Sequence, residues 1–150
     1  MQMKLRFSWI LDGKLAVGER PRSYFDLMSL GFTAAVNLQE EGEPNPVREI
    51  PEGFLWKRVS IEDGIVGGVP SVEQIKTAVK AIEGFLKEER ATYVHCYAGV
   101  GRSPTVCMAY LARSESLRLV EAYDRIATAH PLTDPTSEQL QTLDRYLREL

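Results

Sequence analysis

The sequence predicts a single α/β domain over residues 1–150, in which helices flank a central, mostly parallel sheet of about four to five strands. Three observations lead to this expectation. Short apolar segments alternate with longer segments of helical periodicity, an order typical of parallel sheets. No repeat, low-complexity tract or Pro/Gly/Ser-rich linker divides the chain. Its 150 residues, 44% of them hydrophobic, suffice for one core but are too few for two domains of ordinary size.

The first elements are expected to be a hairpin and a short helix. Two apolar segments, 7–10 and 15–17, flank an Asp-Gly turn, and this pattern is typical of a β-hairpin. Ser23 is a favoured N-cap residue, so a helix is expected from there to about Leu30. Gly31 then provides the residue type that commonly ends a helix.

Three further strands are expected in the interior of the chain. Residues 33–38, 54–61 and 92–95 are short, mainly apolar segments. Between the first two of them lies a polar segment, 40–46 (EEGEPNP), which has no periodic content and is expected to be a loop. The order of these segments places the strand 92–95 near the middle of the predicted sheet.

The clearest helix in the sequence follows Ser71. Ser71 and Gln74 have the spacing of a capping box, which satisfies free N–H groups at a helix N-terminus. Hydrophobic residues then recur at helical spacing at Val72, Ile75, Val79, Ile82 and Leu86. Three more helices are expected at about 103–113, 119–129 and 137–150.

The segment 95–103 (HCYAGVGRS) connects the last predicted strand to the helix that follows it. It carries a nucleophile, Cys96, six residues before an anion-binding side chain, Arg102. The residues between them are Tyr97, Ala98, Gly99, Val100 and Gly101. Their two glycines let the backbone curl so that successive N–H groups point inward. At the carboxyl end of a central strand, where ligands bind in such folds, this loop is expected to hold a tetrahedral oxyanion such as a phosphate monoester.

This loop resembles the signature loop of the cysteine-dependent protein tyrosine phosphatases. The segment 60–64 (SIEDG) is similar to the general-acid segment of their small dual-specificity members. The segments 7–23 (FSWILDGKLAVGERPRS) and 34–41 (AAVNLQEE) are similar to the same group, the compact atypical dual-specificity phosphatases and their microbial relatives. The resemblance covers nearly the whole chain.

The resemblance implies a two-step reaction that uses neither a metal nor another cofactor. Cys96 would attack phosphorus, Asp63 would protonate the leaving group, and a cysteinyl-phosphate would form. Water activated by Asp63 would then release phosphate, while Arg102 would hold two phosphate oxygens throughout. The implied substrates are phosphorylated proteins or peptides, with phosphotyrosine preferred over phosphoserine and phosphothreonine. The loop contains no lysine, unlike family members that act on inositol phospholipids.

Each proposed chemical role has an alternative. Cys96 must be ionised to attack, and a helix N-terminus and Arg102 favour the thiolate; the alternative is a buried structural cysteine. Asp63 lies in a glycine-rich loop that can move, although an aspartate before glycine is also a common turn residue. Glu62 is a competing candidate for the acid. Ser103 is expected to donate a hydrogen bond to the cysteine sulfur, to act as the helix N-cap, or both.

Four other residues receive a more ordinary interpretation. His95 is expected to orient the loop by backbone hydrogen bonds rather than to carry protons. Gln139 resembles a water-positioning glutamine of the family, but its spacing from Thr136 also predicts a helix cap. The first glutamine position of the family pattern falls on Pro135. Cys107 is expected to be a small residue of the hydrophobic core. His130 is expected to be a helix cap or a surface residue.

Composition limits the remaining function classes. A net charge of −3 disfavours nucleic acid as the main partner, and no apolar segment reaches the ~20 residues of a membrane span. Two cysteines and the lack of a secretory signal lead us to expect a cytoplasmic monomer. Two histidines without ligand-like spacing predict no metal site. Two other functions remain open: an arsenate reductase-like thiol oxidoreductase, which would need a resolving cysteine, and a phosphate-binding module without turnover.

Overall fold

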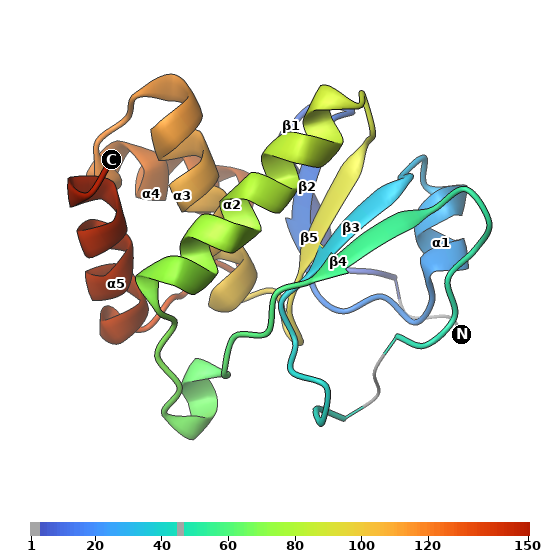
Figure 1. Ribbon diagram of the computed structural model, residues 1–150, viewed down its shortest axis with the longest axis horizontal. Helices are drawn as coiled ribbons and strands as arrows, with labels where there is room; N and C mark the ends of the chain where they lie inside the picture. Colours follow the sequence, from blue (N-terminus) through green and yellow to red (C-terminus); the bar gives the residue numbers. More distant parts are fainter. Residues whose placement is uncertain (1–3, 45–46) are drawn as a thin grey trace.

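The computed structural model describes residues 4–44 and 47–150, and within them a five-stranded mixed sheet is flanked by five α-helices (Figure 1). The last two residues of the predicted 40–46 loop lie outside the described residues. The elements are, in order, β1 (Phe7–Leu11), β2 (Leu15–Gly18), α1 (Tyr24–Ser29), β3 (Ala34–Asn37), β4 (Leu55–Arg58), the 3₁₀ turn η1 (Gly64–Val66), α2 (Val72–Lys87), β5 (Thr92–His95), α3 (Arg102–Glu115), α4 (Leu119–Ala129) and α5 (Ser137–Arg148).

The strand order is β1-β2-β5-β3-β4, which places β5 at the centre of the sheet. β5 runs parallel to both of its neighbours, and β3 runs parallel to β4. Among the strand pairs of residues 4–44 and 47–150, only the hairpin of β1 and β2 is antiparallel. The predicted hairpin and the mostly parallel sheet are therefore confirmed.

Side chains alternate between two cores on opposite faces of the sheet, as the two-residue period of a strand requires. On β5, Val94 belongs to the larger core with α2, α3, α4 and α5, whereas Tyr93 belongs to the smaller core with α1. In Figure 1, α2, α3, α4 and α5 lie on one side and α1 on the other. Both faces are thus covered, but unequally.

Three of the four predicted N-cap residues cap a helix in the structure. Ser23 caps α1, and capping boxes begin α2 at Ser71 and α5 at Thr136. The N-cap interpretation of Ser103 is wrong, because α3 begins at Arg102 and its N-cap residue is Gly101. The Gly101 carbonyl already accepts the first helical hydrogen bond, from the Thr105 N–H at 3.1 Å.

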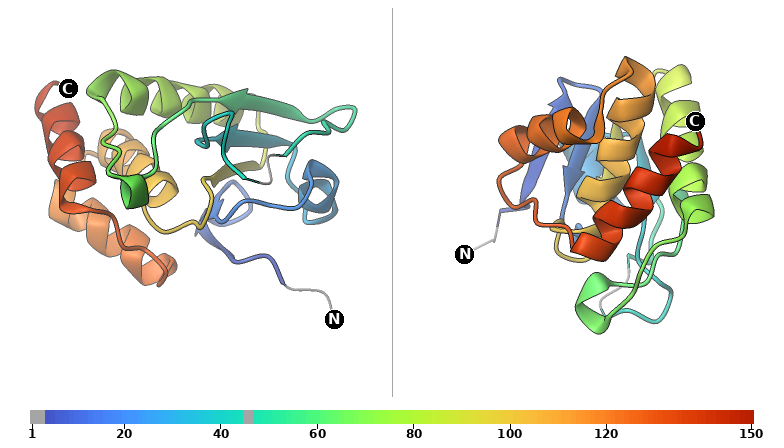
Figure 2. Two further views of the ribbon diagram at one scale, coloured as in Figure 1. Left: turned by 90° about the horizontal axis from the view of Figure 1, so that it is seen from below. Right: turned by 90° about the vertical axis from the view of Figure 1, so that its left-hand side faces the viewer.

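The loops that follow β3, β4 and β5 lie at one edge of the sheet, the lower edge in Figure 1 and the near side in the left view of Figure 2. They meet there because the carboxyl ends of parallel strands share an edge. The loop 95–103 and the acid segment 60–64 therefore come together at this lower edge of the sheet.

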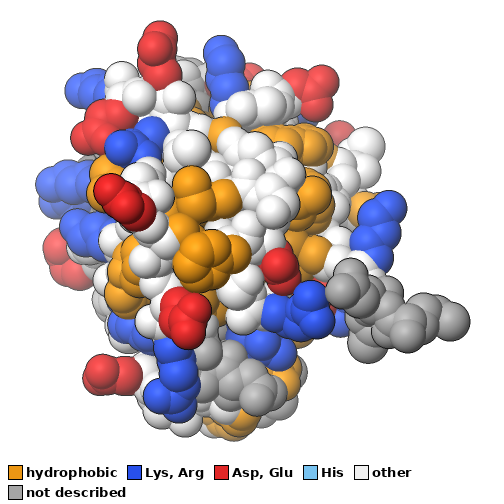
Figure 3. Space-filling view, turned by 90° about the vertical axis from the view of Figure 1, so that its right-hand side faces the viewer, with side chains coloured by type: hydrophobic (Ala, Val, Ile, Leu, Met, Phe, Trp, Pro, Cys, Tyr) orange, Lys and Arg blue, Asp and Glu red, His pale blue; other side chains and the backbone are white. Residues whose placement is uncertain are grey.

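A different face, the one that includes α1, shows hydrophobic side chains between charged ones (Figure 3).

Candidate active site

The loop from Cys96 to Gly101 is a short connection between the central strand and the N-terminus of α3. Carbonyl groups of this loop accept hydrogen bonds from residues outside the loop. The Arg20 N–H donates to the Tyr97 carbonyl at 3.0 Å. Because the C=O and N–H of a trans peptide point in opposite directions, the next N–H, that of Ala98, points toward the loop interior. This geometry matches the inward-facing backbone that the sequence predicts.

Cys96 lies at the floor of this loop and is almost fully buried, with 2% of its surface exposed. Its Sγ is 3.2 Å from the Ser103 Oγ. A thiolate can only accept, so the hydroxyl would donate to the ionised sulfur. The same hydroxyl is placed to donate to the Gly18 carbonyl at 3.4 Å, and its single proton can instead turn to the sulfur when the thiol ionises. The predicted contact between this hydroxyl and the sulfur is therefore present.

Arg102 is buried beside the loop, with 3% of its surface exposed. Its two terminal nitrogens donate to both carboxylate oxygens of Glu43, Nη1 at 2.6 Å and Nη2 at 2.8 Å. Nη1 also donates to the Ile61 carbonyl at 2.8 Å. Burial by itself would lower the pKa of Arg102, but the hydrogen bonds to Glu43 and the nearby negative charges raise it above its ordinary value. The guanidinium is thus charged and held in one orientation.

Asp63 reaches the same place from the loop after β4. Its Oδ2 lies 3.3 Å from Arg102 Nη2, and its side chain is 31% exposed. The competing Glu62 packs instead against Gly68, where an added Cβ would lie 2.5 Å from the Glu62 Cγ. Of these two carboxylates, only Asp63 lines the cavity that contains Cys96. The geometry supports Asp63 over Glu62 as the acid.

Gln139 combines the two interpretations that the sequence left open. Its Oε1 accepts from the Thr136 N–H at 2.8 Å, which completes the predicted capping box. The same amide lies against the loop, because a Cβ added to Gly101 would be 2.8 Å from that Oε1. Gln139 also lines the cavity with Cys96. Its cap role is confirmed, and its role toward water stays a prediction.

His95 is fully buried behind the loop. Its Nε2 is 3.0 Å from the Tyr24 hydroxyl, and its Nδ1 is 3.4 Å from the Cys96 carbonyl. A carbonyl only accepts, so Nδ1 carries the proton and Nε2 accepts from Tyr24. Burial lowers the pKa of His95 to about 3, so the ring is neutral near pH 7. The arrangement supports an orienting role rather than proton transfer.

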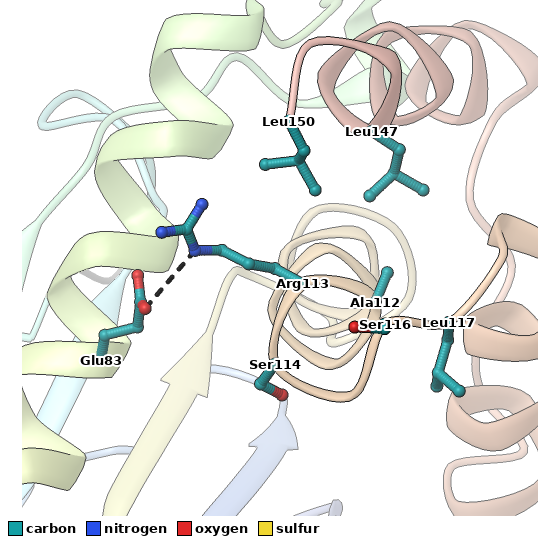
Figure 4. Close-up of a pocket in the computed structure, with 8 residues that line it drawn as sticks. All are labelled: Glu83, Ala112, Arg113, Ser114, Ser116, Leu117, Leu147 and Leu150. Atoms are coloured by element: carbon teal, nitrogen blue, oxygen red, sulfur yellow. Dashed lines mark ion pairs between the residues drawn. The ribbon is translucent and has the colours of Figure 1, made fainter.

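The cavity above Cys96 is small, about 60 Å³. This volume exceeds the roughly 10–15 Å³ that a single water needs, so the cavity has room for a small ligand. A larger hollow of about 460 Å³ lies between α2, α3 and α5, where Arg113 pairs with Glu83 (Figure 4). Its lining includes no cysteine or histidine, so the chemistry-bearing side chains are gathered at the smaller cavity.

The sequence analysis missed two residues of the site, Glu43 and Asp134, and it gave a different role to His130, which contacts the Gly99 carbonyl of the loop. Glu43 comes from the polar loop after β3, and Asp134 lines the cavity from the segment before α5. The assignment of His130 as a possible surface residue is wrong: only 1% of it is exposed, although it does end α4. Its position before Pro131 at a helix end had suggested only a cap, and no local pattern indicates its partners.

Other expected features can be compared with the described part of the chain. Cys107 is fully buried in the larger core, as predicted, and both cysteines are free thiols. Residues 4–44 and 47–150 contain no group of three or more His, Cys, Asp or Glu side chains arranged to hold a metal ion. Within the same residues, no helix combines the length and apolar character of a membrane span.

Sequence relatives point to one family. A family model described as "Dual specificity phosphatase, catalytic domain" matches residues 18–149. Dual specificity protein phosphatase 5 of Rattus norvegicus is 33% identical over 95 residues, which are 63% of this chain and 24% of the relative. Dual specificity protein phosphatase 14 of Mus musculus is 34% identical over 112 residues, which are 73% of this chain and 52% of the relative. The chain thus spans about a quarter to a half of the length of these two relatives.

Solved structures agree with this result. The crystal structure of Tk-PTP in its active form superposes with a TM-score of 0.83 at 30% identity, covering 99% of this chain and all of that one. The human tyrosine phosphatase-like serine/threonine/tyrosine-interacting protein has the same fold, with a TM-score of 0.84 at 19% identity over 97% of this chain and 98% of that one. Because the family model matches nearly all of the sequence, including the cysteine loop and the acid segment, the chain belongs to the dual specificity phosphatase catalytic domain family.

Proposed function

We propose that this chain is a protein phosphatase domain that hydrolyses phosphotyrosine, and more slowly phosphoserine and phosphothreonine, through a cysteinyl-phosphate intermediate. One observation carries this proposal. Cys96, Arg102 and Asp63 line the same small cavity. The nucleophile, the phosphate-binding arginine and the proton donor can therefore all act on one phosphate group, as phosphoryl transfer requires.

In the first step, the Cys96 thiolate attacks phosphorus and the ester P–O bond breaks. Arg102 and the inward N–H groups stabilise the charge on the phosphate oxygens. Asp63 gives its proton to the leaving oxygen, which departs as a neutral alcohol or phenol. A phenol is the better leaving group, which is why phosphotyrosine is the preferred substrate.

In the second step, water attacks the phosphorus of the cysteinyl-phosphate and the S–P bond breaks. Asp63, now a carboxylate, accepts a proton from the water, so that phosphate leaves and the acid is restored. The Ser103 hydroxyl donates to the departing sulfur, 3.2 Å away, and favours its release as a thiolate. Gln139, which lies against the loop, is the candidate for orienting the water.

The partners of the domain are proposed to be phosphorylated proteins or peptides. The five residues between Cys96 and Arg102 include no lysine, which favours these substrates over inositol phospholipids. We further propose that the domain acts as a cytoplasmic monomer without nucleic-acid or membrane partners. Light scattering of the purified chain tests the monomer, and fractionation of cells that produce it tests the location.

Phosphate release from p-nitrophenyl phosphate, with and without added thiol, tests the activity. Thiol-independent release by the wild type, abolished in Cys96→Ser, is expected. Cys107→Ala is the matched control, since it removes the chain's other thiol from the core, and it should retain activity. Arsenate-dependent thiol consumption would indicate a reductase instead. Phosphate binding without any release would indicate a binding module, and either result would contradict the proposal.

Phosphopeptides carrying phosphotyrosine, phosphoserine or phosphothreonine, compared with a phosphoinositide, test the substrate class. We expect the highest kcat/KM for phosphotyrosine. Faster hydrolysis of the phosphoinositide would contradict the assignment to protein substrates.

A further inference from the structure

His130 connects three segments that are far apart in the sequence. It ends α4, is almost fully buried, and uses both ring nitrogens. Its Nε2 lies 2.7 Å from the Gly99 carbonyl, and its Nδ1 lies 2.8 Å from the Ser8 Oγ on β1. A carbonyl only accepts, so Nε2 carries the proton and Nδ1 accepts from the Ser8 hydroxyl. Burial lowers the pKa of His130, which agrees with this neutral form.

The hydrogen bond from His130 determines which way one loop peptide faces. The Gly99 carbonyl points outward to the imidazole. In a planar trans peptide, the N–H of Val100 must then point in the opposite direction, toward the interior of the loop, where the phosphate is proposed to bind. If this peptide turned over, a carbonyl oxygen would replace an N–H donor beside the phosphate, and attraction would become repulsion.

Gly99 cannot secure this orientation by itself. Its φ of +74° belongs to the left-handed region, and a Cβ there would lie 2.6 Å from the Glu19 nitrogen, so the position requires glycine. Glycine, however, imposes little preference on the peptide that follows it. The orientation must therefore come from outside the loop.

The carbonyls of Tyr97, Gly99 and Val100, in the middle of the loop, accept hydrogen bonds from residues far away in the sequence. Two of the donors are backbone N–H groups, which no ordinary substitution removes: Arg20 donates to Tyr97 at 3.0 Å, and Asp134 donates to Val100 at 2.8 Å. The donor to the Gly99 carbonyl is a side chain, that of His130. Sequence variation can thus abolish this one anchor without altering the main chain.

We propose that His130 is a positioning residue, which keeps the Gly99–Val100 peptide turned so that its N–H faces the bound phosphate. It does not line the cavity itself, and it acts through the loop backbone. The inference deepens the proposed function, on which it rests for the identity of the anion. Anion binding does not require turnover, so the two can fail separately.

Two amide variants of His130 test whether the hydrogen bond to the Gly99 carbonyl is needed or whether any polar side chain at this position suffices. In His130→Gln the side-chain amide nitrogen can take the place of Nε2 and donate to Gly99. In His130→Asn the amide group ends near the place of Nδ1 and falls short of that carbonyl. Both variants are made in the Cys96→Ser background, and the dissociation constant for inorganic phosphate is measured by calorimetry. Melting temperatures report the structural cost separately.

We expect His130→Asn to weaken phosphate binding by about 10- to 100-fold, close to the cost of losing one donor to a charged group, and His130→Gln to stay within about threefold of the parent. With Cys96 present, alkylation of this thiol by iodoacetamide at pH 6 should slow in His130→Asn and recover in His130→Gln. Equal losses in both variants, or a loss in neither, would overturn the proposal.

A measurement on the unmodified side chain covers the case in which both variants fail to fold. In the Cys96→Ser protein with His130 intact, the backbone amide signal of Val100 is followed by NMR during a phosphate titration. We expect a large, saturable downfield proton shift with the same midpoint as the calorimetric curve. A Val100 amide that does not respond to phosphate would overturn the proposal, whatever the behaviour of the variants.

Discussion

The carboxylate of Glu43 accepts hydrogen bonds from both terminal nitrogens of Arg102, at 2.6 and 2.8 Å, although the two residues are 59 positions apart in the sequence. Burial by itself would raise the pKa of Glu43, but the hydrogen bonds from Arg102 lower it below its ordinary value. The carboxylate is therefore charged at neutral pH, as the guanidinium is. Together with the Ile61 carbonyl and Asp63, this pair engages the N–H groups of both terminal nitrogens and fixes the plane of the guanidinium.

Glu43→Gln tests whether this pairing supports catalysis. Losing hydrogen bonds to a charged group, worth about 1.5–3 kcal/mol, should lower kcat/KM by about 10- to 100-fold. Steady-state kinetics with p-nitrophenyl phosphate measure the change. Glu41→Gln is the matched control, because Glu41 belongs to the same loop and is exposed. An increase in activity would instead identify Glu43 as a competitor of phosphate.

Asp63→Asn tests the proton donor. General acid catalysis contributes about 10²–10⁴-fold, so hydrolysis of phosphotyrosine should slow by about that factor. A substrate whose leaving group needs no proton should be affected much less. Glu62→Gln, at the neighbouring position outside the cavity, should behave like the wild type. If Glu62→Gln shows the leaving-group effect and Asp63→Asn does not, the acid is misassigned.

Ser103→Ala tests the second chemical step. Without the hydroxyl at 3.2 Å, the sulfur is a poorer leaving group, and hydrolysis of the cysteinyl-phosphate should slow by about 10-fold or more. Stopped-flow measurements should show a burst of p-nitrophenol equal to the enzyme concentration, followed by slow turnover. Ser114→Ala, farther along α3, should show no such burst. An unchanged steady-state rate in Ser103→Ala would show that this hydroxyl is dispensable.

The buried, neutral His95 predicts a dependence of stability on pH. In the unfolded chain an ordinary histidine binds a proton below about pH 6.5, whereas in the folded chain the pKa of His95 is about 3. The unfolded state therefore binds more protons between these values, and the free energy of unfolding should fall as pH decreases from about 6.5. The slope approaches about 1.4 kcal/mol per pH unit for one such group.

Urea unfolding between pH 7.5 and 4.5 measures this slope. His95→Asn removes the titrating ring and keeps an amide that can donate to the Cys96 carbonyl, so its slope should be smaller. His130, whose pKa is also lowered by burial, should leave part of the slope in place. Identical slopes in the wild type and His95→Asn would contradict the assignment of His95 as neutral and buried.

Much of the fold could be predicted because its signals are local. The capping pair Ser71 and Gln74, the Asp-Gly hairpin turn and the apolar segment 92–95 each act within a few residues. The 3₁₀ turn Gly64–Val66 was not predicted, since its glycine-rich segment carries no periodic pattern. The start of α3 was predicted one residue late, because a serine before proline is a strong capping signal, whereas here Gly101 ends the loop.

The sequence by itself determined which residues make up the reactive loop, because Cys96, the glycines, Arg102 and Ser103 are close in the chain. Only the tertiary structure decided what surrounds it. Glu43 and His130 reach the loop from 59 and 31 positions away, through the packing of a polar loop and a helix end against the sheet edge. Such partners leave no local pattern, because each is selected by a contact that exists only once the strands and helices have assembled.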